Sequence, residues 1–364
     1  MAVPQSQVVN ITGYRFLDLP DRDELKEVLQ DKCDSLGLRG LILVAHEGIN
    51  YFCAGSQQTT DQFRAFLDLP DAGPLGSPLR GRFQDIPCKV SYSTKMPFKR
   101  MLVKAKKEII SLGMDEVRPV ERTGNRLDAE ELKRWLDEGR PCVLVDTRSD
   151  YETRIGTFEA AVDLKIDHFR EWPAAIQTLP AEAKGMPVVT FCTGGVRCEK
   201  ATTVLMDAGF SDVYQLDGGI LRYFEKCGGA HWRGDCFVFD DRVAVTPELA
   251  EADVTMCFKC REPLTKEDRA SPLYVYEQQC PYCASRKTRR YHMVREHHKP
   301  KEPKAPKPSR GHPGAETPSP PGFAGAPCAS DGGLCASDPK GDLCGESPMH
   351  EAPTEQPQQV ASSR

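Results

Sequence analysis

The sequence predicts a multidomain protein of the α/β class, with an α+β unit, a parallel-sheet unit, a cysteine-rich segment and a disordered tail in that order. The chain has 364 residues, which exceeds one ordinary hydrophobic core, so two or three domains are expected. Short apolar strands alternate with amphipathic helices in the first two units, and two Cys-x-x-Cys pairs and a Pro-rich end follow them. These changes predict domains at residues 1–122, 123–233, 234–298 and 299–364.

The composition is that of a globular protein, because hydrophobic residues make up 39% and charged residues 28% of the chain. The N-terminus, MAVPQSQVVN, has no basic segment followed by an apolar one, so no signal peptide is expected. No apolar run approaches the roughly 20 residues that span a bilayer. We therefore expect a cytoplasmic protein, whose 15 cysteines serve as core residues, metal ligands or catalysts rather than as disulfide partners.

The first unit has the predicted element order βαββαβ, which matches a split, ferredoxin-like fold. Its predicted strands are 8–16, 41–44, 49–53 and 89–93. One helix starts at Pro20-Asp21 and ends at Gly37, and a second is marked by apolar side chains at positions 63, 66 and 67. His46 and Glu47 lie at the tight turn between two strands, where a structural role and substrate contact are equally open.

The second unit is predicted to be an α/β domain whose parallel sheet is covered on both faces. It starts with a helix that Asp128 caps, with Glu131 three residues later as in a capping box. Strands rich in apolar residues follow at 143–145, 187–191 and 213–216, with helical segments between them. Asp146 ends the first of these strands, and we expect it to form a structural pair with Arg148.

One cysteine, Cys192, directly follows the strand 187–191, at the sheet edge where α/β folds bind ligands. The candidate active-site loop after it consists of Thr193, Gly194, Gly195, Val196 and Arg197. Converging backbone N–H groups, the N-terminus of a helix predicted over 199–208, and the charge of Arg197 all favour a thiolate. Because the thiolate is the nucleophilic form, Cys192 is the candidate catalytic residue, with a small buried core residue as the alternative. Cys198 is expected to support the core or the loop.

Two basic segments predict a polyanionic partner. Residues 80–107 contain nine Lys/Arg and one acid, and residues 284–310 contain ten Lys/Arg and two acids. The first segment also carries Phe83, Tyr92 and Phe98, which could stack on bases, so RNA binding is favoured over the alternative of a solvated strand face with core aromatics. The candidate RNA-binding residues are Lys99, Arg100, Lys104 and Lys106.

The two Cys-x-x-Cys pairs have the spacing of a structural zinc knuckle, with nineteen residues between them. The predicted metal ligands are Cys257, Cys260, Cys280 and Cys283. Four thiolates would fill a tetrahedral shell, so a zinc ion here would hold structure and not catalyse. The basic segment that follows, with Tyr291, could then be presented to RNA.

The loop and its surroundings resemble a rhodanese (sulfurtransferase) domain, through Val145-Asp146-Thr147-Arg148, Tyr151-Glu152 and Leu216-Asp217-Gly218-Gly219. More narrowly, four segments are similar to one rhodanese-containing family: CTGGVRCEKA at 192–201, AHEGIN at 45–50, KEII at 107–110 and CFVFD at 236–240. This is the bacterial tRNA uridine hydroxylase family, and the resemblance covers roughly residues 8 to 283. The tail after Lys299 departs from the family pattern.

The resemblance implies an enzyme that uses molecular oxygen as a co-substrate to form 5-hydroxyuridine at the wobble position of the tRNA anticodon loop. It also implies an acylphosphatase-like N-terminal domain, and it assigns the essential loop cysteine to Cys192. No iron triad, flavin, haem or nucleotide signature accompanies these segments, and no obligate protein partner is inferred. Two other functions stay open, a sulfurtransferase with a Cys192 persulfide and a non-enzymatic, zinc-stabilised RNA-binding protein.

Overall fold

The computed structural model describes residues 7–70, 79 and 81–285, which belong to one compact unit. The basic segment from residue 286, Tyr291 and the predicted disordered tail at 299–364 lie outside the described residues. Within the described ranges, no helix is both long and apolar enough to cross a membrane.

The N-terminal domain is the predicted βαββαβ unit with one additional strand. Its elements are β1 (Val8–Phe16), α1 (Arg22–Ser35), β2 (Arg39–Ala45), β3 (Gly48–Gly55), α2 (Gln57–Leu67), β4 (Lys89–Ser93) and β5 (Met101–Ala105). The strand order β4-β1-β3-β2-β5 contains the antiparallel ferredoxin-like order, so that prediction is confirmed. The additional strand β5 pairs in parallel with β2 and was not predicted, because it lies inside the basic segment interpreted as an RNA-binding surface.

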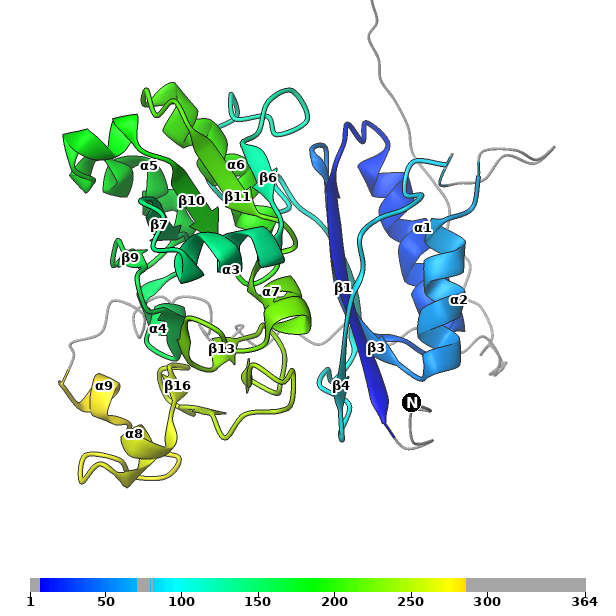
Figure 1. The fold of residues 1–364 in the computed structure, drawn as a ribbon. Coiled ribbons are helices and arrows are strands. Elements are labelled where there is room, and N and C mark those ends of the chain that lie inside the picture. The colour runs from blue at the N-terminus through cyan, green and yellow to red at the C-terminus, as the bar shows by residue number, and fades with distance from the viewer. Residues whose placement is uncertain (1–6, 71–78, 80, 286–364) are drawn as a thin grey trace, which may run out of the picture. The chain divides into compact units, whose positions relative to one another are not determined.

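The two faces of this sheet differ because side chains alternate along each strand. Val9 and Ile11 of β1 pack into a core with residues of α1 and α2, which cover one face of the sheet (Figure 1). Asn10, Thr12 and Tyr14 alternate with them, so they lie on the opposite face, which carries no helix of this domain. We call that surface the open face of the N-terminal sheet.

The central domain is built on a parallel sheet, as predicted. Its strand order is β6 (Asn125–Leu127), β11 (Val213–Leu216), β10 (Val188–Phe191), β7 (Val143–Asp146) and β9 (Val162–Asp163), and every pairing is parallel. Leu144 of β7 packs in a core with α3 (Ala129–Asp137) and α7 (Gly219–Cys227). Its neighbour Val145 packs on the other face with α5 (Trp172–Ala175) and α6 (Val196–Asp207). The sheet is therefore covered on both faces.

Two local expectations in this domain need correction. Asp128 does cap α3, by accepting a hydrogen bond from the Glu130 amide, but Glu131 does not close a capping box. Its carboxylate accepts from the indole N–H of Trp135 at 2.6 Å. Helix α6 begins at Val196 rather than at residue 199, because Gly195, with φ of +97°, makes the turn that starts it.

Shorter elements complete the described chain: α4 (Asp150–Thr153), β8 (Gly156–Phe158), β12 (Trp232–Gly234), β13 (Cys236–Phe237), β14 (Ala244–Val245), β15 (Thr255–Met256), β16 (Pro263–Leu264), α8 (Lys266–Ala270) and α9 (Pro281–Ser285). Trp232, Val238 and Val245 share the core of α3 and α7, so the segment after the parallel sheet packs back onto it. The first cysteine pair lies in the turn of the hairpin β15–β16, and the second lies at the start of α9.

Candidate active site

Cys192 lies at the turn between β10 and α6, as the sequence predicts, and its side chain is 1% exposed. The thiol Sγ accepts a hydrogen bond from the Gly195 amide at 3.1 Å. The outward carbonyls of the loop are held by the first turn of α7, where the Ile220 amide donates to Cys192 O at 3.0 Å and the Leu221 amide donates to Thr193 O at 3.1 Å. Because these carbonyl groups point away from the thiol, the loop directs its backbone amides, those of Gly195 and Arg197, at the Cys192 sulfur.

The Gly218-Gly219 turn fits tightly under this loop. Gly219 has φ of +69°, and a Cβ at this position would lie 2.4 Å from the carbonyl oxygen of Cys192. Both the backbone conformation and the close approach therefore require glycine. This explains physically why a Gly-Gly pair follows β11 in the rhodanese-like pattern.

The surroundings of Cys192 favour the thiolate. Burial alone raises the pKa of this thiol, but a hydrogen bond from Cys198, the charge of Arg197 and the Arg197 and Gly195 amides outweigh it and lower the pKa to about 6. Cys198 is itself fully buried, and burial together with the hydrogen bond to Cys192 raises its pKa well above the usual range. The Cys192 thiol therefore favours the thiolate form, whereas the Cys198 thiol keeps its proton and donates a hydrogen bond to Cys192.

Contrary to the prediction from the sequence, Arg197 is not the last residue of the loop. It lies in the first turn of α6, and its guanidinium donates to both carboxylate oxygens of Glu152 at 2.7 and 2.8 Å. Both side chains are buried, with 7% and 1% exposed. The Ser149 amide also donates to Glu152, at 3.1 Å. The carboxylate balances much of the charge that Arg197 brings to the pocket.

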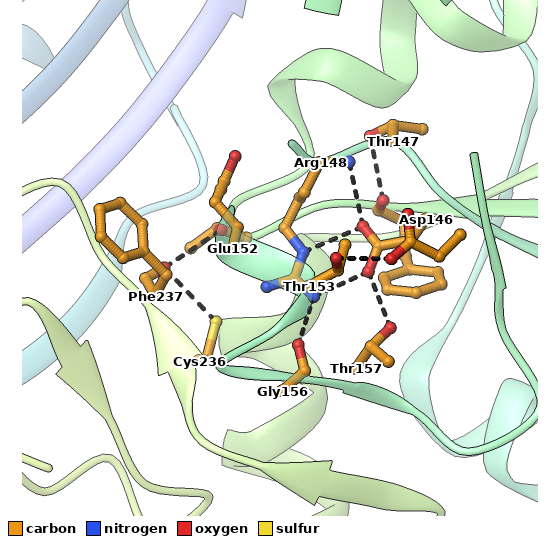
Figure 2. Close-up of polar contacts among 12 residues, drawn as sticks. Asp146, Thr147, Arg148, Glu152, Thr153, Gly156, Thr157, Cys236 and Phe237 are labelled. Atoms are coloured by element: carbon orange, nitrogen blue, oxygen red, sulfur yellow. Dashed lines mark hydrogen bonds and ion pairs between the residues drawn. The ribbon is translucent and has the colours of Figure 1, made fainter. Parts of the chain in front are cut away.

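Asp146 and Arg148 form the structural pair that the sequence indicated (Figure 2). The Arg148 guanidinium donates to Asp146 at 3.0 and 2.7 Å and to the Gly156 carbonyl at 2.7 Å. Thr157 donates to the same carboxylate at 2.8 Å. Because both charged side chains are 0% exposed, they brace the end of β7 from inside the domain and do not face the pocket.

The start of α6 also joins the two domains. Glu199 accepts from the hydroxyl of Tyr14 in β1 at 2.9 Å. The next residue, Lys200, is 1% exposed, and its ammonium lies 2.7 Å from both Glu47 and Glu108. Glu47 therefore has a structural role at its turn, and the AHEGIN, KEII and CEKA segments meet at one place.

The CFVFD segment makes a further link to the N-terminal sheet. Arg242 pairs with Asp240 at 2.6 Å and donates to the hydroxyl of Ser91 in β4 at 2.8 Å. This contact brings residues 238–242 to the rim of the same pocket.

A pocket of about 660 Å³ lies between these parts. Cys192 and the loop that follows it line one side, and the open face of the N-terminal sheet forms another wall, which includes Asn10, Tyr14, Asn50, Phe52, Lys89 and Ser91. This volume lies within the roughly 300–1,000 Å³ of typical small-molecule sites. Sequence reasoning missed Tyr14 and Lys89, although the polar residues that alternate with the core of β1 mark this face.

The candidate RNA-binding residues are all exposed, and only one of the four borders the pocket. Lys106 lines it, Lys104 pairs with Leu43 on the open face, and Lys99 and Arg100 lie just before β5. Of the three aromatic residues expected to stack on bases, Phe83 does not fit that interpretation, because it is 0% exposed within the N-terminal core. Phe98 lines the pocket, and Tyr92 is 39% exposed.

The predicted metal ligands do come together. The sulfur atoms of Cys257, Cys260, Cys280 and Cys283 all lie within 4.8 Å of one another. Four thiolates at a Zn–S distance of about 2.3 Å stand about 3.8 Å apart in a tetrahedral shell, so this arrangement fits zinc. Arg154, directly after α4, pairs with Glu262 and lies 4.0 Å from the ring centroid of Tyr282, which fastens this cysteine cluster to the central domain.

Comparison with known proteins agrees with this architecture. Residues 8–109 match the family model described as UPF0176 acylphosphatase like domain, and residues 128–226 match the Rhodanese-like domain. The tRNA uridine(34) hydroxylase of Cupriavidus taiwanensis is 48% identical over 288 residues, which is 78% of this chain and 99% of that protein. Proteins of the same name from Cupriavidus necator and Burkholderia mallei are 48% and 47% identical and cover 77% and 76% of this chain, and 98% and 92% of their own length.

Proposed function

This chain belongs to the tRNA uridine(34) hydroxylase family, and from that premise we propose that it hydroxylates the wobble uridine of tRNA with molecular oxygen, through the thiolate of Cys192. The observation that carries the proposal is the position of this ionisable thiol in a pocket large enough for a nucleoside. A thiol that only filled the core would not combine accessible space with amides directed at its sulfur.

Uridine C5 reacts poorly with oxygen, and a thiolate can overcome this by adding to C6 of the ring. The Sγ–C6 bond forms, and the electron pair of the C5=C6 bond moves toward C5 and the C4 carbonyl oxygen, which makes C5 electron-rich. C5 then bonds to oxygen. Two electrons and two protons from an external donor reduce the second oxygen atom to water. Loss of the C5 proton and departure of Sγ from C6 restore the double bond.

The substrate would reach Cys192 as a base turned out of the anticodon loop. Taking a base from a loop costs a few kcal/mol at most, because it has no pairing partner to lose. Lys104 and Lys106 lie on or beside the open face that forms the pocket wall, where they would bind phosphates flanking the base. RNA binding by the predicted residues Lys99, Arg100, Lys104 and Lys106 is part of this proposal.

A sulfurtransferase reaction is the second candidate, and one observation favours it. The Gly195 amide that hydrogen-bonds Cys192 Sγ could equally hold the terminal sulfur of a persulfide. Against it, a transferase with a small acceptor has no need of a pocket wall supplied by a second domain or of exposed lysines beside it.

We further propose that the four cysteines hold one structural zinc ion. Bound zinc would fix β15, β16 and α9 relative to one another, and its thiolate ligands leave it no open position for catalysis.

The test of the chemical proposal uses tRNA that carries 5-fluorouridine at the wobble position, because fluorine cannot leave C5 as a proton does. The wild-type protein is expected to form a covalent complex with this RNA. Cys192→Ser is expected to form none, and Cys227→Ser, at a half-buried cysteine on α7, is expected to behave as the wild type. If no complex forms while ordinary tRNA is hydroxylated, C6 addition is wrong, and oxygen chemistry at the Cys192 sulfur replaces it.

A further inference from the structure

Two lysines are buried where the domains meet, and they differ in how their charge is balanced. Lys200 is 1% exposed, and its ammonium forms ion pairs with Glu47 and Glu108. Lys89, the first residue of β4, is 8% exposed, yet within the described part of the chain it has no ion pair and no side-chain hydrogen bond. Its one close partner is the ring of Tyr14, whose centroid lies 5.4 Å from the ammonium.

A buried cation without a counter-ion is unfavourable, because burial removes the water that solvates it. A lysine with a purely structural role is expected to resemble Lys200. The negative groups that influence Lys89 within the described residues, Cys192 and Asp217, form no ion pair with it, so its environment is that of a group whose hydrogen-bonded anionic partner arrives with a ligand. Consistent with this, burial lowers the pKa of Lys89, and the negative charge of Cys192 is the largest influence that raises it.

The position of Lys89 shows which ligand atoms it can reach. It lines the same pocket as Cys192, on the wall formed by the N-terminal sheet, next to Thr12 across the strand pairing. Its Cε would lie 3.4 Å from a Cβ at Gly218. The adjacent Gly219 packs directly against the Cys192 carbonyl. The Lys89 side chain therefore reaches the Gly218-Gly219 turn beneath the Cys192 loop, and it lines the same pocket as Cys192.

We propose that Lys89 is a further catalytic residue, which donates a hydrogen bond from its ammonium to the C4 carbonyl oxygen of the uracil ring while Cys192 attacks C6. This inference rests on the proposed function. When the Sγ–C6 bond forms, the C5=C6 electron pair moves onto the C5–C4–O4 system, and the charge of the thiolate moves to that oxygen. A fixed cation there stabilises the charge as it develops, and no proton needs to leave Lys89.

The test compares Lys89→Met, which keeps an unbranched side chain only one atom shorter and removes its charge, with Lys26→Met as the matched control. Lys26 lies on α1, which packs on the other face of the same sheet. Single-turnover hydroxylation at saturating tRNA is measured between pH 6 and 9, together with the tRNA dissociation constant at several salt concentrations. Lys89→Met is expected to lower the rate constant by about 10²–10³-fold at every pH, and to change the dissociation constant by less than about threefold.

Three results would overturn the inference. A rate loss that disappears at pH 9 would mean that Lys89 serves only to ionise Cys192. A normal rate with weaker tRNA binding and a salt slope reduced by about one would assign Lys89 to a phosphate. An unchanged rate and unchanged binding would leave it no role in the reaction.

Other measurements keep these outcomes interpretable. Lys89→Gln serves as a second neutral variant if Lys89→Met does not fold, and the rate of Cys192 alkylation by iodoacetamide reports pocket integrity without any hydroxylation. Failure of the proposed function would appear differently, as a wild-type protein that forms no 5-hydroxyuridine. An active wild type with an equally active Lys89→Met protein contradicts only the role of Lys89.

Discussion

Glu152→Gln removes one charge from the buried pair that positions Arg197, while it preserves the shape of the side chain. Burial alone would raise the pKa of Glu152, but the guanidinium of Arg197, the nearby Arg148 and the Ser149 amide hold it below the usual range. Because both partners are almost fully buried, loss of one charge leaves the other uncompensated. Changes of this kind destabilise proteins by about 3–5 kcal/mol.

The assay is urea unfolding followed by tryptophan fluorescence. All three tryptophans of the chain, Trp135, Trp172 and Trp232, pack in the two cores of the central domain, so the signal reports that domain. Glu225→Gln is the control, since its pair with Arg222 is about half exposed and its loss should change the unfolding free energy by less than about 0.5 kcal/mol.

The sign of the pH dependence follows from the lowered pKa. The ionised Glu152 carboxylate stabilises the folded state at pH values above the ordinary pKa of Glu, which is about 4.3. This contribution is lost as the pH falls through the lowered pKa that Glu152 has in the folded state. The difference between wild type and Glu152→Gln should therefore be largest near neutral pH and shrink in acid. A variant within about 1 kcal/mol of the wild type at pH 7 would refute the role assigned to this pair.

Three further outcomes are expected. Iodoacetamide should alkylate Cys192 with a rate that rises with pH around a midpoint near 6 and then levels off, and a midpoint near 9 would contradict the thiolate assignment. Purified protein should contain about one zinc ion per chain, and Cys280→Ser should release the zinc and lower the stability of the fold. Protein that is prepared without chelator and contains no zinc would contradict the proposed zinc site. Charge reversal at the four exposed positions Lys99, Arg100, Lys104 and Lys106 should weaken tRNA binding and reduce the salt slope of binding by about one per lost contact. Unchanged binding would show that the N-terminal domain does not bind the RNA through these residues.

The parts of the fold that local pattern decides could be predicted from the sequence. The strand limits 8–16, 89–93 and 213–216 agree with β1, β4 and β11, because apolar alternation or an apolar run stops at clear turn residues. The cysteine after β10 was identified for the same reason, since a strand, a glycine turn and a helix follow one another directly.

The parts that depend on distant partners could not be predicted. Arg197 meets Glu152 across 45 residues, and nothing near either residue indicates that their charges cancel. The strand β5 is hidden in the sequence because it lies inside the basic segment 80–107, and its hydrogen-bond partner β2 lies far earlier in the chain. Likewise, the sequence shows Lys89 only as one charge of a basic segment, whereas the pairing of β4 with β1 places it against Gly218, in the turn beneath the Cys192 loop.

The central claim is that the Cys192 thiolate carries out the hydroxylation, and one measurement tests it most directly. Wild-type protein and folded Cys192→Ser are incubated with unmodified tRNA under oxygen and a reductant, and the nucleosides are then quantified by mass spectrometry. Serine is nearly isosteric with cysteine, but its hydroxyl stays protonated at neutral pH, so only the wild type is expected to form 5-hydroxyuridine at the wobble position. A folded Cys192→Ser protein that forms it at the wild-type rate would contradict the account.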